Sequence, residues 1–238
     1  MIKPMIILFL LGALQGLVGW IMVQSGLEDS KLLYVSHHKL AIHFILALGV
    51  LCYALWFALE LLIPKEQIVV NGSLRKFTFW IVAILVVQFV YGTFMAGLKA
   101  AIDAPTWPLI NGKFFPSPVY FIGDDQFTGL SFLMDNPLVV HFIHRNLAYV
   151  ITALIFIWWW KARKRGGSNL FHKTRVIPLL IVLLQVLLGI LSVLKVADSK
   201  TFLWLAETHQ LVAMLLLLSL VWMIYILRSK PAIKEGPD

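Results

Sequence analysis

The chain is organised around the stretch Asn136-Pro-Leu-Val-Val-His-Phe-Ile-His-Arg-Asn-Leu-Ala-Tyr149, where an apolar helix begins and carries two histidines and an arginine in its first three turns. Asn136 is a good N-cap residue and Pro137 a good first helical residue. His144 therefore lies about 10 Å below the start of the helix, at roughly 1.5 Å per residue. An ionisable side chain at that depth in an apolar segment needs a partner, and a metal ion suits a neutral imidazole.

The composition around this stretch is that of a membrane protein. The chain has 238 residues, of which 60% are hydrophobic and 13% charged, and its mean hydropathy is +0.87. These values lie outside the range of ordinary soluble domains. The net charge of +8 comes from basic residues in short segments between apolar runs, which is typical of membrane orientation. We therefore expect a protein in a lipid bilayer and no nucleic-acid partner.

Six apolar runs are long enough to span a hydrocarbon core of about 30 Å, which takes about 20 helical residues. The runs lack the alternation of a membrane barrel, so we expect helices. The predicted fold is all-α, a polytopic bundle of six transmembrane helices. The predicted spans are Pro4–Gln24, His37–Ile63, Phe77–Leu98, Pro137–Trp160, Val176–Val196 and Phe202–Leu227.

Basic residues predict the orientation. Most of the 20 Lys and Arg residues lie at the N-terminus, in the loops after the second and fourth spans, and in the C-terminal tail. The positive-inside rule therefore places both termini in the cytoplasm. Residues 99–136 then face outward and are too many for a plain connector. We expect a structured cap whose aromatic side chains suit a membrane interface or cover a ligand: Trp107, Phe114, Phe115, Tyr120 and Phe121. Trp158 to Trp160, at the inner boundary, are predicted to form an aromatic belt.

An internal repeat links three of the spans. Each outward-running span of the repeat has a glutamine and, four residues later, a glycine: Gln15 and Gly19, Gln88 and Gly92, Gln185 and Gly189. Residues four apart share one helix face, where glycine permits a close backbone approach and glutamine can hydrogen-bond to a neighbour. Two of the following loops also share an Asp-Ser-Lys sequence, at 29–31 and at 198–200. The hairpin is therefore predicted to be a duplicated unit.

Each returning span of this repeat carries a histidine at nearly the same depth: His43, His144 and His209. Histidines that face each other from two helices of a four-helix bundle are a familiar way of holding haem. His144 and His209 lie on adjacent hairpins and are the natural pair. His43 would need a partner from a hairpin that precedes the first span.

These residues resemble the haem A synthase family of cytochrome oxidase assembly proteins. The resemblance covers essentially the whole chain, and the outer-loop stretch with its Asn-Gly turn is the most specific part. The stretches that carry it are Gly12–Leu27, Val35–His43, Ala96–Ala100, Thr106–Pro116, His144-Arg145 and Ala206–Gln210.

The resemblance implies an eight-helix enzyme of the bacterial cytoplasmic (inner) membrane, built from two similar four-helix halves. The C-terminal half would bind haem b through His144 and His209, as an electron relay. The N-terminal half would bind the substrate, haem O, and oxidise a ring methyl group to a formyl group, giving haem A for cytochrome c oxidase. His43 matches the later of its two iron ligands. The implied partners are haem O synthase, the oxidase assembly machinery and an electron donor, and homo-oligomerisation is left open.

The chain departs from the family at its start, because it resembles the family only from the third helix onward. Residues 1–76 would be the remaining hairpin of the substrate-haem half, and residues 77–238 the haem b bundle. In the family the first hairpin carries the other substrate-half histidine and a glutamate implicated in the chemistry, so no catalytic residue is assigned. We expect the protein to begin upstream. The alternatives are a non-catalytic haem-binding assembly protein and a truncated, inactive gene product. A solute transporter is disfavoured because no span looks broken by Gly or Pro.

Other polar residues near these histidines have two readings each. Arg145 and Lys39 could pair with haem propionates or reach to the membrane interface. His141 is expected beside the haem rather than on its iron. His37 and His38 could supply a substitute iron ligand, but beside the helix cap they are expected to be solvated at the outer surface.

Overall fold

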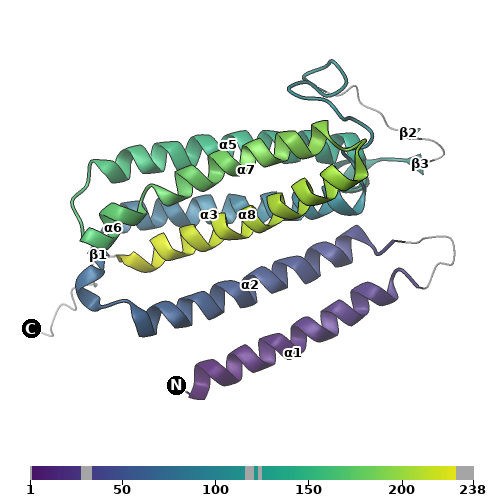
Figure 1. Ribbon diagram of the computed structural model, residues 1–238. Helices are drawn as coiled ribbons and strands as arrows, with labels where there is room; N and C mark the ends of the chain where they lie inside the picture. Colours follow the sequence, from purple (N-terminus) through teal and green to yellow (C-terminus); the bar gives the residue numbers. More distant parts are fainter. Residues whose placement is uncertain (1, 28–33, 116–120, 123–124, 229–238) are drawn as a thin grey trace, which may run out of the picture.

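A computed structural model of the chain describes residues 2–27, 34–115, 121–122 and 125–228. Six long helices lie side by side (Figure 1). Each is long and apolar enough to cross a membrane. The span of α7 also includes the short helix α6 that precedes it. The predicted all-α, multi-pass membrane fold is therefore confirmed. The six helices are α1 (Ile2–Gln24), α2 (His37–Leu62), α3 (Gly72–Gly97), α5 (Pro137–Arg163), α7 (Ile177–Leu194) and α8 (Ser199–Ile226).

Short elements close the two ends of the bundle. We call the end where α1 begins and α8 ends proximal, and the opposite end distal (Figure 1). At the proximal end lie η1 (Lys65–Gln67), α6 (Asn169–Thr174) and the parallel strand pair β1 (Val69–Val70) and β4 (Leu227–Arg228). At the distal end lie α4 (Gly129–Met134) and the antiparallel pair β2 (Phe121–Ile122) and β3 (Asp125–Gln126).

Side-chain caps decide where the helices begin. The Asn136 side chain accepts two backbone N–H groups of α5, as the sequence predicts. Asn71 caps α3 in the same way, so this helix begins before the predicted Phe77. The last helix also begins early, because Asp198 is its N-cap and accepts the backbone N–H and the hydroxyl of Thr201. These hydrogen bonds hold the pKa of Asp198 below its usual value, and the bond from the Thr201 hydroxyl has the largest effect.

The core lies between α3, α5, α7 and α8, with one face of α2 against it. Trp158 of α5 is fully buried there, and its indole N–H donates to the hydroxyl of Thr78 on α3 at 2.9 Å. The prediction that Trp158 belongs to an aromatic belt is therefore wrong. Successive residues of a helix point about 100° apart, so three adjacent tryptophans cannot share one face. Trp160 of the same run is 42% exposed.

The hairpin of α1 and α2 lies along one side of this core (Figure 1). Helix α1 has no buried residue and packs against α2, where the Tyr53 hydroxyl donates to the Pro4 carbonyl at 3.4 Å. Leu48 and Leu59 of α2 are buried against the rest of the chain. The three histidine-bearing helices, α2, α5 and α8, all run from the distal end to the proximal end (Figure 1).

Candidate functional site

The repeated glutamines each contact the histidine of the returning helix. Each contact joins a side-chain amide to an imidazole nitrogen or to the carbonyl of the same histidine. The Nε2 atoms of the glutamines lie 3.2 Å from Nδ1 of His43 for Gln15, 3.0 Å from the carbonyl oxygen of His144 for Gln88, and 3.1 Å from Nε2 of His209 for Gln185. The motif therefore positions one imidazole in each of the three hairpins.

The repeated glycines make room for the same three rings. A Cβ atom added at Gly19 or at Gly189 would lie 2.9 Å from Cε1 of the facing histidine, and one at Gly92 would lie 3.2 Å away. Such distances are too short for an ordinary contact. Gly12 and Gly16, on the same helix as Gly19, have open space at this position. The close approach predicted for the motif is thus directed at the histidine ring.

His144 and His209 face each other from α5 and α8. Their ring centroids are 6.5 Å apart, and the ring planes are inclined by 69°. Two imidazoles that each place a nitrogen about 2.0–2.1 Å from one shared metal ion have centroids roughly 6 Å apart. The separation therefore fits an ion held between the two rings.

The hydrogen bonds of His209 fix which of its nitrogens is available. Its Nδ1 lies 3.1 Å from the backbone carbonyl oxygen of Gln185, and a carbonyl can only accept, so Nδ1 carries the proton. Nε2 then has the lone pair, which accepts a hydrogen bond from the Gln185 amide. On His144, Nε2 lies 3.5 Å from the Gln88 amide nitrogen, which can only donate, and the buried Nδ1 has no partner among the described residues. In both rings Nε2 thus has a lone pair of the kind that ligates iron, and a glutamine amide contacts it.

Unsatisfied donors lie next to this pair. Arg145 is 7% exposed, and its Nη1 donates to the Pro108 carbonyl at 2.7 Å. Its Nε and Nη2 are buried without a partner among the described residues. His141, one turn earlier and 2% exposed, has an unpartnered Nδ1 as well. Buried donors of this kind are costly, so the site favours an acceptor such as a carboxylate.

The segment after α3 folds back onto the first turns of α5. The predicted Asn-Gly turn is present, since Asn111 and Gly112 have φ values of 48° and 80°. Ile110 and Lys113 flank the turn and exchange backbone hydrogen bonds of 2.9 and 3.0 Å. Trp107 donates from its indole nitrogen to the Tyr149 hydroxyl at 2.9 Å. With the Arg145 bond, this contact holds the segment over the distal end of α5. The predicted cap residue Tyr120 and the side chain of Phe121 lie outside the described part.

His43 has a different environment. It is half-buried on α2 against Gln15 and Gly19, and none of the other histidines pairs with its ring in the part of the chain that the structure describes. Lys39, one turn earlier, is half-buried and forms no ion pair among the described residues. Glu207 is exposed. The structure therefore brings together the rings of His144 and His209, with Arg145 as the next residue of α5, and it gives the His43 ring no second imidazole among the described residues.

His38 is exposed, in agreement with the expected solvated position, whereas His37 is half-buried. Both rings contact Asp135, which lies between α4 and α5. The two histidines and the aspartate are nearly 100 residues apart, and no local pattern in the sequence signals the contact.

The fold and the site define a class, a multi-pass helical membrane protein whose histidine-bearing hairpins bring two imidazoles face to face. Residues 1–221 match the family model described as cytochrome oxidase assembly protein. The chain therefore belongs to this family. No solved structure matches it.

Curated relatives agree with this membership. Haem A synthases of Flavobacterium johnsoniae and Nitrosospira multiformis are each 34% identical to the chain, over 94% of its length. The haem A synthase of Novosphingobium aromaticivorans is 36% identical over 96%. The chain spans 63%, 61% and 63% of the length of these three relatives.

Proposed function

We propose that the protein acts as a haem A synthase, an oxidoreductase that converts a ring methyl group of haem O to a formyl group and so supplies haem A to cytochrome c oxidase. The family and the names of its relatives support this reaction. The observation that carries the proposal is the pair His144 and His209, with centroids 6.5 Å apart beside the unsatisfied donors of Arg145.

Residues 77–238 are proposed to hold haem b as the resident cofactor. His144 and His209 would ligate its iron, and Arg145 would pair with its propionates, with His141 nearby. Bound there by two imidazoles, haem b would supply one-electron transfer. The protein's own part is to hold the Nδ1–H of His209 in a hydrogen bond to the Gln185 carbonyl, which leaves the lone pair on Nε2, and to keep the two rings face to face.

Residues 1–76 are proposed to contribute to the substrate site. His43 would ligate the iron of haem O, and Lys39 would contact its propionates. No described residue is assigned to the oxidation itself. The proposed setting is a bacterial inner membrane, with both termini in the cytoplasm, and the proposed partners are haem O synthase, the oxidase assembly machinery and an electron donor. Self-association is compatible with this scheme.

The test is production of haem A in a bacterium that makes haem O but no haem A. Expression of the protein should yield extractable haem A, and His144→Ala and His209→Ala should abolish it. His172→Ala, a change of an exposed histidine on α6, is the matched control and should leave the yield unchanged. Haem O that persists unconverted beside well-expressed wild-type protein would refute the enzymatic proposal.

A second function, haem carrying without catalysis, is favoured by the environment of His43. Its ring contacts Gln15 and pairs with no other histidine of the described chain. A carrier would bind haem b at His144 and His209 and release it to an apo-protein acceptor. Transfer to apo-oxidase subunits without haem A formation would support the carrier, and haem A formation would exclude it as the sole function.

A further inference from the structure

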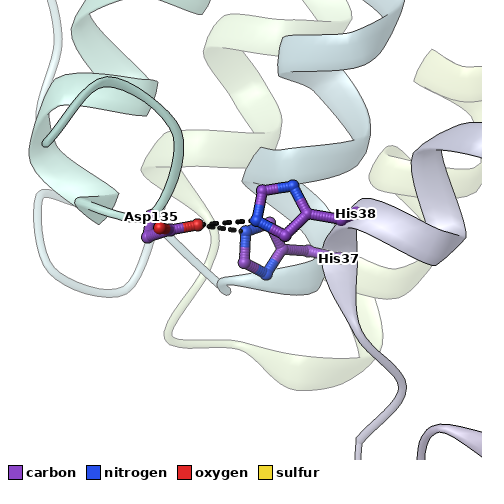
Figure 2. A group of neighbouring side chains, drawn as sticks. All are labelled: His37, His38 and Asp135. Atoms are coloured by element: carbon purple, nitrogen blue, oxygen red, sulfur yellow. Dashed lines mark hydrogen bonds and ion pairs between the residues drawn. The ribbon is translucent and has the colours of Figure 1, made fainter. Parts of the chain in front are cut away.

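A second cluster of potential metal ligands lies at the distal end, where α2 begins and α4 ends. Nε2 of His37 lies 2.9 Å from Oδ1 of Asp135, and Nε2 of His38 lies 2.8 Å from the same oxygen. The three ligand atoms all lie within 4.8 Å of one another. Figure 2 shows both imidazoles directed at the carboxylate.

The convergence of these two rings is unusual for adjacent residues. Neighbours in a helix point about 100° apart and do not normally share a contact. Here the centroids of His37 and His38 are 4.0 Å apart, and both Nε2 atoms point to one oxygen. Without a metal ion each nitrogen must carry a proton to bond that oxygen. A divalent cation could replace both protons and be bound by the same three groups.

The surroundings hold the cluster in place. A Cβ atom added at Gly97, the last residue of α3, would lie 2.5 Å from Cβ of His37, so the glycine permits this close approach. Phe94 packs edge-on against both imidazoles, with centroids 5.2 Å from each. Asp135 is the C-cap of α4 and directly precedes the cap of α5. Helices α2, α3, α4 and α5 therefore all fix the geometry.

The cluster is also open to ions from water. The side chain of His38 is 46% exposed, that of Asp135 31% and that of His37 17%. Two imidazoles and one carboxylate are a donor set typical of divalent transition-metal ions such as Zn²⁺, with further positions left for water.

We propose that His37, His38 and Asp135 form a binding site for a divalent transition-metal ion, separate from the haem iron. The ion links the start of α2 to the junction of α4 and α5, and so fastens the α1–α2 hairpin to the distal end of the remaining helices. The site goes beyond the proposed haem A synthase activity and does not depend on it.

The test uses Zn²⁺ as the probe and the full chain in lipid nanodiscs, loaded with haem so that the buried histidines are occupied. The protein is stripped with EDTA, incubated with Zn²⁺ and desalted, and zinc and iron are measured together by mass spectrometry. We expect wild-type protein to retain about one more zinc per chain than His38→Ala or Asp135→Asn, whose affinity should fall at least about tenfold. His172→Ala is the control and should bind as wild type does.

A thermal measurement separates metal binding from mere folding. Zn²⁺ should raise the midpoint of unfolding of the wild type and leave those of His38→Ala and Asp135→Asn unchanged. Equal zinc content in all four proteins would overturn the proposal. A second result would also overturn it: the two variants unfold at a lower midpoint than wild type, and Zn²⁺ changes the midpoint of none of the proteins. The cluster would then be only a hydrogen-bonded contact. If a variant loses its haem, the decision rests on wild-type protein loaded with Co²⁺ in place of Zn²⁺. A Co²⁺ absorption spectrum identical to that of the ion in water would also refute the site.

Discussion

The hairpin α1–α2 and the two hairpins α3–α5 and α7–α8 use the same Gln–Gly motif but surround their histidines differently. His43 is positioned by Gln15 and Gly19 and meets no second imidazole of the described chain. His144 and His209 are positioned in the same way and also face each other at 6.5 Å. The motif therefore places a ring at a given depth, but two hairpins must come together before two rings face each other.

Removing one of the two facing imidazoles should give the largest contrast between these regions. His144→Ala or His209→Ala should lower haem b affinity by more than about 100-fold and abolish the six-coordinate spectrum, because the proposed haem site loses one of its two imidazoles. His43→Ala should leave the haem b spectrum intact. The measurement is haem content and absorbance of purified protein, with His172→Ala as the control. An equal loss of haem b in His43→Ala would show that the role of His43 is not separate from that of His144 and His209.

The buried guanidinium should give the next largest effect. Arg145→Met removes two donors that have no partner among the described residues, so the affinity for haem b should fall about tenfold or more. The two imidazoles are retained, so the spectrum should stay the same. Arg145→Lys keeps the charge but lacks the planar fork, and a smaller loss is expected. Haem dissociation rates measure both.

A second readout separates haem contact from the bond between Arg145 and the Pro108 carbonyl. Limited proteolysis near Lys113 reports whether the segment over α5 is released. If Arg145→Met releases this segment but haem dissociates at the wild-type rate, the arginine holds the segment and does not contact haem. Lys39→Met is the corresponding change on α2 and should leave haem b dissociation unchanged.

Alanine in place of the close glycines should give an intermediate effect. In Gly189→Ala the new methyl group would meet Cε1 of His209 at 2.9 Å, so the ring must move, at a cost of about 1–3 kcal/mol. The haem b spectrum should broaden or shift. Gly19→Ala has the same clash with His43 and should spare that spectrum. Gly16→Ala meets open space and is the control. An unchanged spectrum in Gly189→Ala would mean that the glycine does not set the position of the imidazole.

The sequence predicts the parts of the site that depend on local or repeated patterns. Continuous apolar runs predict the spans, Asn136 predicts the start of α5, and the repeated Gln–Gly spacing predicts a helix face of close approach. That this face meets the histidine rings comes from the structure. Hydropathy does not predict the burial of Trp158, because it does not distinguish a lipid-facing residue from a core residue. The contact of His37 and His38 with Asp135 depends on tertiary packing across nearly 100 residues, and no local propensity indicates it.

Changing the glutamines should have the smallest effect, and an unequal one. The His209 ring is held by the backbone carbonyl of residue 185, which Gln185→Leu retains, so haem b content should stay within about twofold of wild type. Among the described residues, the Gln15 side chain is the polar partner of the His43 ring. Gln15→Leu therefore frees that ring and should weaken haem O binding about threefold. Absorbance titration with haem O, and haem content for haem b, measure the two effects. Equal losses in both variants would mean that the backbone bond does not orient His209, and that the two regions differ only in the presence of a facing imidazole.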